Sequence, residues 1–235
     1  MTYRRLAVYY TPPPGALANF GAAWLGWDAQ NGRSAAHPDI AALPAPIADL
    51  TATPRKYGFH ATLKAPFRPA EGITAADVIA AMAKVCAGLS PVALHGGLHL
   101  AQIEGFLALI PARESAALQA LAADLVRDLD HLRAPLTKAE IARRDPERLS
   151  ARQRAYLDEW GYPYVMEAFQ FHMTLTGPVS AATGERVARA LAPILRPMLP
   201  DPHPISAVSL MGEDTAGRFH LIERFNLEGG NAHPA

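Results

Sequence analysis

Cysteine is nearly absent from this sequence, since Cys86 is the only one among 235 residues. A single thiol excludes an internal disulfide and a zinc site built on cysteine pairs, and it suits a reducing compartment. Long apolar runs are also missing. The apolar run that begins at Leu6 stops at Tyr10 before three prolines, and no stretch approaches the roughly 20 apolar residues of a membrane span. We therefore expect a cytoplasmic protein that makes no membrane contact.

Net charge is absent as well, because 22 basic side chains balance 22 acidic ones. A neutral chain has no long-range electrostatic field that would attract a polyanion, so we expect no extended nucleic acid as a partner. A small cationic pocket for a phosphorylated metabolite remains compatible with this balance. Half of the residues are hydrophobic, which is enough to bury the core of one large domain or of two small lobes.

The chain is rich in both helix breakers and helix formers, with 21 prolines and 17 glycines beside many alanines. We therefore predict many short elements. Thr74 and Asp77 form a capping-box pattern at the start of one predicted helix. The predicted helices cover residues 16–25, 74–89, 114–132, 149–160 and 181–199, and the predicted strands cover 6–10, 58–63, 92–100, 105–110, 169–175, 205–211 and 219–227.

The order of these elements contains an internal repeat. Strand, helix, strand, strand occurs over about 57–110 and again over about 168–227, with a charged, mainly helical insertion at about 112–164. We predict an α+β fold in one bilobal domain, with two antiparallel sheets facing a central groove and helices packed outside.

The repeat is also visible in individual residues. The first copy reads Phe59-His60-Ala61-Thr62-Leu63-Lys64-Ala65-Pro66-Phe67, and the second reads Phe171-His172-Met173-Thr174-Leu175-Thr176-Gly177-Pro178-Val179. Five of nine positions are identical. A single His-x-Thr would be a weak signal, but two copies that each open an equivalent unit are not easily accidental.

Alternation along a strand places each histidine and its threonine on one face, with apolar residues on the other. If the two polar faces meet, His60 and His172 can serve as a general base and a general acid at phosphorus, because histidine titrates near neutral pH. Thr62 and Thr174 can donate hydrogen bonds to the phosphate oxygens. This chemistry requires no metal or other cofactor.

These two segments resemble the 2H phosphoesterase superfamily, whose hallmark is a pair of His-x-Thr/Ser motifs in a bilobal fold. The segments from Pro54 to Phe67 and from Phe169 to Gly177 more specifically resemble a branch associated with bacterial phosphonate metabolism. The resemblance implies that His60 and His172 are the catalytic pair and that Thr62 and Thr174 hold the phosphate. It also implies a cyclic phosphodiester substrate, with 5-phosphoribosyl 1,2-cyclic phosphate as the candidate.

Four further residues are candidates for binding the substrate. Lys64 shares the predicted polar face with His60, and Arg55, Lys56 and Tyr57 precede the first motif. Together they could form a cationic pocket for a phosphorylated sugar or nucleotide. The alternative for Arg55 and Lys56 is that they are ordinary solvated loop residues.

Other readings of the sequence remain open. His95 and His99 could be imagined in a metal cluster, but no carboxylate or cysteine lies at a ligand spacing, so we expect no metal. His220 and Arg224 are expected on one face of the last strand. Alternative functions are an RNA-end 2',3'-cyclic phosphodiesterase or 2'-5' ligase-like enzyme, and a phosphate-ligand binding protein without catalysis. The arginine-rich residues 137–159 could form a lid or a mixed-charge helical insertion.

Overall fold

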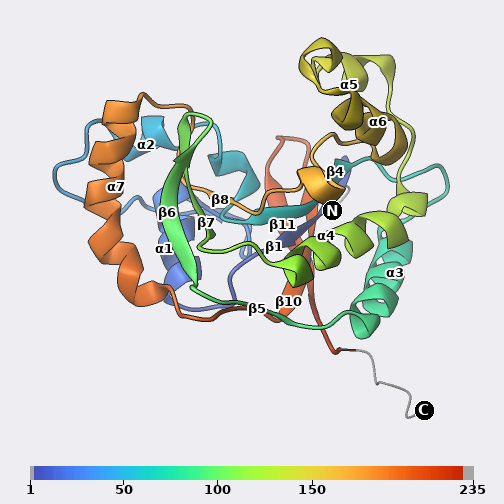
Figure 1. Ribbon diagram of the computed structural model, residues 1–235, viewed down its shortest axis with the longest axis horizontal. Helices are drawn as coiled ribbons and strands as arrows, with labels where there is room; N and C mark the ends of the chain where they lie inside the picture. The colour runs from blue at the N-terminus through green and yellow to red at the C-terminus, as the bar shows by residue number, and fades with distance from the viewer. Residues whose placement is uncertain (1–2, 230–235) are drawn as a thin grey trace.

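An antiparallel sheet of seven strands organises the molecule, and helices flank it (Figure 1). The computed structural model describes residues 3–229. The sheet runs in the order β11 (Phe219–Asn226), β10 (Ala207–Glu213), β1 (Arg5–Tyr10), β4 (Ala61–Phe67), β8 (Met173–Thr174), β7 (Phe106–Pro111) and β6 (Leu98–Ile103). Two short ribbons pair β2 (Trp27–Asp28) with β3 (Arg33–Ser34), and β5 (Val92–Leu94) with β9 (His203–Ile205).

The helices are α1 (Ala16–Leu25), α2 (Ile47–Leu50), α3 (Ala75–Gly88), α4 (Ala116–Asp128), α5 (Lys138–Ala142), α6 (Ala151–Trp160) and α7 (Ala181–Leu195). Five of the seven helices lie close to their predicted positions, whereas α2 and α5 were not predicted as separate helices. The capping box predicted for α3 is present, because the Asp77 amide donates to Thr74 Oγ1 and the Thr74 amide donates to the Asp77 carboxylate. No helix within residues 3–229 has the length and apolar character needed to cross a bilayer.

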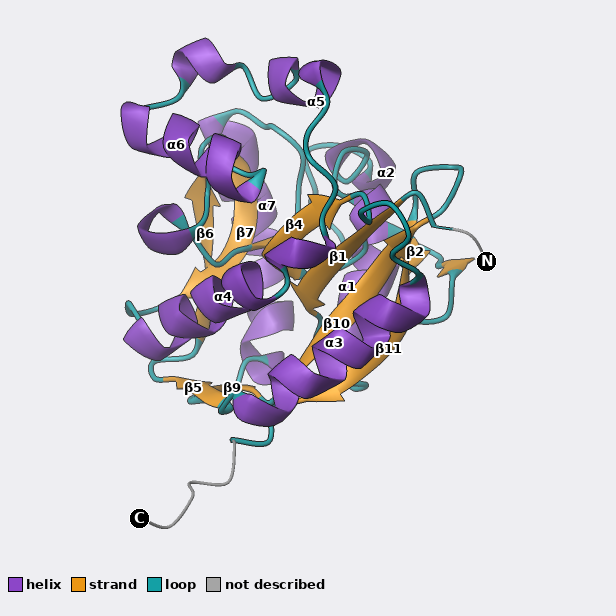
Figure 2. Ribbon diagram, turned by 90° about the vertical axis from the view of Figure 1, so that its right-hand side faces the viewer, coloured by secondary structure: helices purple, strands orange, loops and turns teal. Residues whose placement is uncertain are grey.

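The predicted α+β fold with antiparallel strands is confirmed, and the two expected sheets are the two halves of one. The halves meet at β4 and β8, which are paired at Ala61 and Met173. Helix α3 covers β10 and β11, whereas α7 covers β6 and β7 (Figures 1 and 2). The helices therefore lie outside the sheet, as the sequence predicts.

Each half of the sheet contains elements from both repeats. Strand β4 and helix α3 come from the first repeat, yet they lie with the hairpin β10–β11 from the second. Strand β8 and helix α7 come from the second repeat and lie with the hairpin β6–β7 from the first. A sequence repeat identifies equivalent residues, but it does not specify which strands pair, because pairing joins distant segments.

The charged segment at 112–164 divides into two structural parts. Helix α4 packs into the main core through Leu118, Leu121 and Leu125, and it contacts β4. Helices α5 and α6 instead stand apart from the sheet (Figure 1). We refer to residues 137–162 as the cap. A separate apolar cluster of Val126, Tyr156 and Val165, with Trp160 packed against it, fixes the cap to α4.

The central strand β1 shows how the two faces of the sheet differ. Leu6, Val8 and Tyr10 point into the main core beneath the helices. Ala7 and Tyr9 point the other way, into a small cluster with Met211 and Phe219. We call this second face the site face, because it carries both predicted catalytic motifs.

Candidate active site

The first motif is positioned by close packing of α1 against the residue before His60. A Cβ atom on Gly21 would lie 2.1 Å from Cδ1 of the buried Phe59 ring, so only glycine allows α1 to approach this closely. Gly58 has a φ of 74°, in the left-handed region that favours glycine, and it turns the chain into the motif. Together these two glycines set the position at which His60 enters the sheet.

The ring of His60 is held on three sides. Its plane stacks on Tyr9, with 3.8 Å between ring centroids and 25° between the planes. Nδ1 lies 2.9 Å from the Gly58 carbonyl oxygen, and Nε2 lies 3.1 Å from Thr62 Oγ1. Because a carbonyl oxygen only accepts, Nδ1 carries the proton, and in the neutral ring Nε2 is free to accept.

The second motif reproduces this arrangement. His172 Nδ1 lies 2.8 Å from the Gln170 carbonyl oxygen, two residues earlier, just as His60 uses Gly58. Phe106 lies against the ring, with 5.6 Å between centroids. The indole of Trp24 on α1 donates a 2.7 Å hydrogen bond to the Leu175 carbonyl. Helix α1 thus contacts both motifs, and both histidines present Nε2 as the reactive nitrogen.

The two motifs lie side by side at the centre of the sheet. Ala61 opposes Met173, and both side chains are fully buried in the main core. Extending this antiparallel register by one residue in each direction sets His60 opposite Thr174 and His172 opposite Thr62. The four side chains form a two-by-two array on the site face. Diagonal positions in such a pair are typically about 7–8 Å apart, which leaves room for a phosphate between the histidines.

Burial gives His60 an altered titration. Burial lowers the pKa of His60 to about 4; the hydrogen bond with Gly58 opposes this shift, and the neighbouring His172 adds a smaller lowering that is part of it. His60 is therefore neutral at physiological pH, with an unprotonated Nε2. Burial also raises the pKa of Tyr9 well above its ordinary value, so the stacked phenol stays protonated.

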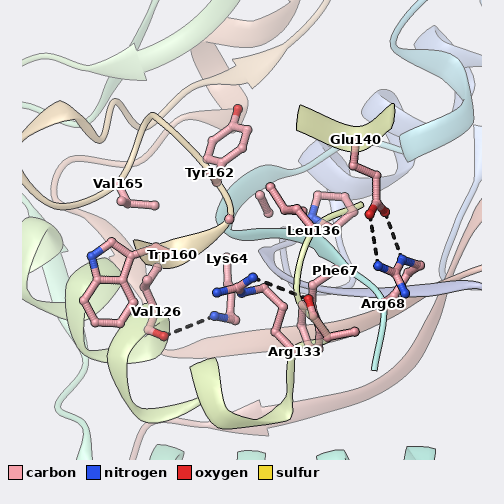
Figure 3. A pocket seen from close by; sticks show the side chains of 14 residues that line it. Lys64, Phe67, Arg68, Val126, Arg133, Leu136, Glu140, Trp160, Tyr162 and Val165 are labelled. Atoms are coloured by element: carbon pink, nitrogen blue, oxygen red, sulfur yellow. Dashed lines mark hydrogen bonds and ion pairs between the residues drawn. The ribbon is translucent and has the colours of Figure 1, made fainter. Parts of the chain in front are cut away.

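Lys64 does not share the face of His60, contrary to the strand alternation. Tyr9 opposes Thr62, but Val8 opposes Lys64, so β4 carries an extra residue between the two pairs. This bulge turns Lys64 toward α4, where Nζ donates to the Val126 carbonyl at 3.1 Å and to Asp130 at 3.2 Å. Figure 3 shows the ammonium beside Val126 and Arg133. Burial lowers its pKa to about 8.

Arg55 forms hydrogen bonds with nearby residues of α1 and α2 and the turn that follows α2. Its guanidinium donates to the carbonyl oxygens of Leu25 and Ala48 and to the hydroxyl of Thr51. These bonds connect α1 and α2 to the turn before the first motif, which is a structural role. The expectation of a cationic pocket built on Arg55 and Lys64 is therefore wrong, since both charges are engaged elsewhere.

Lys56 and Tyr57 remain near the site. The Tyr57 ring lies 6.1 Å from the His60 ring and 5.4 Å from Phe219. The exposed Lys56 ammonium lies 4.9 Å from the centre of the Tyr57 ring. Of the four candidate binding residues, these two are placed to meet a substrate at His60.

The last strand also departs from simple alternation. Leu210 opposes Glu223 and Met211 opposes Leu221, so Ile222 is an extra residue in β11. His220 and Arg224 consequently lie on opposite faces, and the expectation of a shared face is wrong. His220 bonds to Asp214, whereas Arg224 bonds to Thr11 and Pro12. Residues 3–229 contain no group of three or more His, Cys, Asp or Glu side chains arranged for a metal ion.

A cavity of about 950 Å³ adjoins the second motif. It lies between α4 and the hairpin β6–β7, and Ile103, Ile110, Gln170 and Phe171 are among its lining residues. The register that pairs Leu109 with Met173 places Ile110 beside His172 on the site face. The cavity gives space for the part of a ligand that extends past His172.

Sequence reasoning missed Tyr9 and Phe106. Tyr9 lies in a strand that carries no motif, and its role follows only from the pairing of β1 with β4. Phe106 reaches His172 because the hairpin of one repeat pairs with the strand of the other. Each depends on a long-range contact, which no local signal records.

Curated proteins similar to this chain include two relatives that share one name. "Ribose 1,5-bisphosphate phosphokinase PhnN" of Janthinobacterium sp. (strain Marseille) is 38% identical over 183 residues, which cover 77% of this chain and 40% of the relative. The protein of the same name in Laribacter hongkongensis (strain HLHK9) is 39% identical over 175 residues, covering 73% of this chain and 40% of the relative. The matched region is thus well under half the length of these proteins.

Similar solved structures include two that are described by their activity or name. A crystal structure of E. coli LigT complexed with 3'-AMP has 17% sequence identity and a TM-score of 0.43, and the match covers 96% of this chain and 99% of that one. A crystal structure of a phosphoesterase gives 17% identity and a TM-score of 0.41, with 96% and 99% coverage.

A family model described as "Protein of unknown function (DUF1045)" matches residues 62–220. The match begins at Thr62 in the first motif, includes the whole of the second and ends at His220 in β11. It covers well over half of the sequence, and the chain belongs to the DUF1045 family.

Proposed function

We propose that this protein is a metal-independent 2H phosphoesterase that hydrolyses a cyclic phosphodiester of a small phosphorylated sugar. The observation that carries the proposal is the array of His60, Thr62, His172 and Thr174 at the join of β4 and β8. In both copies a carbonyl two residues earlier fixes the Nδ1 proton and leaves Nε2 for chemistry. A structural role would not require the same imidazole tautomer and hydroxyl twice.

The phosphate lies between the two histidines in this mechanism. His60 Nε2 removes a proton from the attacking water as its oxygen bonds to phosphorus. His172 Nε2 donates a proton to the departing alkoxide as the ring P–O bond breaks. One cyclic diester and one water give one phosphate monoester and a free hydroxyl. Each proton transfer by a positioned side chain typically accelerates such a reaction by about 10²–10⁴-fold.

The environment of His60 favours it as the base. Its lowered pKa keeps Nε2 unprotonated at neutral pH, and the neighbouring His172 contributes to that lowering. The Thr62 hydroxyl donates to Nε2 when no substrate is bound. On binding, we expect this hydroxyl to turn to a non-bridging phosphate oxygen, which frees Nε2 for water and stabilises the charge that develops on phosphate.

The choice of a phosphorylated pentose is supported by the names of the relatives. Both are named for ribose 1,5-bisphosphate, which fits a role in phosphonate metabolism with 5-phosphoribosyl 1,2-cyclic phosphate as substrate. The kinase activity itself needs a phosphate-binding loop, commonly Gly-x-x-x-x-Gly-Lys-Ser/Thr. No lysine in this chain follows a glycine, so we assign the matched region a hydrolytic reaction instead.

Phosphorus NMR with a chelator present tests the proposal. The purified protein is incubated with 5-phosphoribosyl 1,2-cyclic phosphate and, separately, with nucleoside 2',3'-cyclic phosphates. The cyclic diester signal of the ribose substrate should be replaced by a monoester signal, and a double variant His60→Ala/His172→Ala should produce none. Faster turnover of oligonucleotide ends would favour the RNA-end enzyme, and tight binding without product would favour a binding protein.

A further inference from the structure

The two motif histidines have different ring contacts, although their motifs are equivalent in sequence. His60 stacks on Tyr9, with 3.8 Å between the ring centroids and 25° between the planes. Among residues 3–229, the aromatic contact of His172 is a tilted one with Phe106, at 5.6 Å and 57°. Both imidazoles hold Nδ1 against a carbonyl oxygen two residues earlier, so the stacked ring is what distinguishes them.

The register of the sheet shows where this difference arises. Strands β1 and β7 are the outer neighbours of the two motif strands, β4 and β8. Tyr9 of β1 opposes Thr62 of the first motif, and Ala108 of β7 opposes Thr174 of the second. Ala108 is therefore the counterpart of Tyr9 in the other half of the sheet. An alanine has no ring, so this position offers His172 no stacking partner.

Tyr9 is held firmly enough for its ring to act as a fixed wall. Its backbone pairs with Thr62 of β4 on one side and with Ser209 of β10 on the other. The residue is only 1% exposed, and Phe219 packs against its ring with 5.7 Å between the centroids. The ring cannot swing away from His60 without disturbing this cluster.

A wall on one plane of an imidazole keeps water from that side of the ring. Water that cannot reach the ring cannot solvate its positive charge, so such burial disfavours the protonated form. The hydrogen-bonding edge of His60 is left open, with Nε2 beside Thr62 Oγ1 at 3.1 Å. A cation–π attraction between a protonated His60 and the Tyr9 ring would act in the opposite direction. Removing the ring decides which of the two effects is larger.

The charges around His60 do not account for its difference from His172. The ion pairs within residues 3–229 include no carboxylate partner for His60. The titratable or charged groups around His60 and Tyr9 are His172 of β8, Tyr57 and the exposed Lys56 of the preceding turn, and Arg5 of β1 paired with Glu213 of β10. Replacing the neutral Tyr9 ring leaves all of these groups in place and changes the access of water.

We propose that Tyr9 is a positioning residue whose stacked ring makes His60, and not the equivalent His172, the general base of the reaction. The inference rests on the proposed function and traces the direction of proton transfer to one contact. Paired acid–base catalysis needs one group protonated and its partner unprotonated, which requires different environments. The repeat supplies two equivalent motifs, and the unequal residues Tyr9 and Ala108 make their environments different.

Titration of His60 by NMR of its imidazole ring tests the stack without reference to turnover. The His60 signals are assigned by their absence from His60→Ala. In wild type the midpoint should lie near pH 4. In Tyr9→Ala it should move toward the ordinary histidine value of about 6.5, because water reaches the ring. Tyr9→Phe keeps the ring, so its midpoint should stay near pH 4.

The pH dependence of kcat/KM on the cyclic phosphate should follow the same pattern. At pH 8 His60 is unprotonated in every variant, and Tyr9→Ala should lose about tenfold through misplacement of the imidazole. At pH 5 its loss should be at least about tenfold greater, because most of its His60 would then be protonated. Tyr9→Phe should stay within about threefold of wild type at both pH values.

Phe225→Ala is the matched control, because it removes a buried ring from the main core on the opposite face of the sheet. It should lower stability without moving the midpoint of His60. A midpoint that stays or falls in Tyr9→Ala, a loss that is equal at pH 8 and pH 5, or an equal midpoint shift in Phe225→Ala would each refute the inference while the hydrolase stands. If wild type hydrolyses no cyclic phosphate, the proposed function itself fails, whatever the titration shows.

Discussion

Gly21→Ala should weaken both folding and catalysis, because it forces α1 away from the first motif. The added methyl group would lie 2.1 Å, 2.3 Å and 2.7 Å from three atoms of Phe59, the residue directly before His60. The ring is buried in the main core and cannot rotate freely, so the helix or the strand must shift. Such overpacking typically costs about 1–3 kcal/mol.

An alanine in place of glycine also raises helix propensity by roughly 1 kcal/mol, which offsets part of that cost. The net loss should therefore be about 0–2 kcal/mol. Gly88 in α3 is the matched control, since a methyl group there would have no heavy atom within 4 Å. Gly88→Ala should gain roughly 0.5–1 kcal/mol through propensity alone.

Urea unfolding and steady-state kinetics on the cyclic phosphate measure the two effects. The displacement of His60 should lower kcat/KM of Gly21→Ala by more than tenfold, because a shift of about 1 Å can cost about 10²-fold. Gly88→Ala should retain full activity. Equal stability of the two variants, or activity of Gly21→Ala within twofold of wild type, would refute this account of how α1 positions the motif.

Three further predictions concern charge. As pH falls, kcat/KM should decline with an inflection near pH 4, where His60 gains a proton. A decline that begins near pH 6.5 would contradict the assignment of His60 as the base. Lys64→Met should lower the free energy of unfolding by about 1–3 kcal/mol, because the hydrogen bonds to Val126 and Asp130 are lost. KM should not change, and a raised KM would show that Lys64 contacts the substrate. Burial lowers the pKa of His203 to about 4 in the folded protein. As pH falls below 6.5, His203 therefore gains a proton in the unfolded chain before it does in the folded one, and the free energy of unfolding falls. His203→Phe should therefore flatten the fall in unfolding free energy between pH 6.5 and 4, and an unchanged slope would refute this.

Local signals in the sequence predicted the elements well. The helix with the Thr74 capping box and the helix over 16–25 are present almost as predicted. One strand expected over 92–100 is divided into β5 and β6, because Gly96 and Gly97 both adopt positive φ. The repeat predicted that the two His-x-Thr motifs are equivalent. It did not predict that their strands are neighbours in one sheet.

Features that depend on pairing between distant strands could not be predicted. A bulge in β4 turns Lys64 away from His60, and a bulge in β11 separates His220 from Arg224. Alternation assumes unbroken register, and a single extra residue inverts every face that follows it. The stacking of Tyr9 on His60 and the contact of Phe106 with His172 likewise join segments far apart in the chain.

The turnover of the single variants His60→Ala and His172→Ala tests the paired-histidine mechanism most directly. Each is assayed in chelator on 5-phosphoribosyl 1,2-cyclic phosphate, after circular dichroism has established that it is folded. Each loss should lower kcat by at least about 10²-fold, as expected for a general acid or base. Near-wild-type turnover by either folded variant would contradict the mechanism.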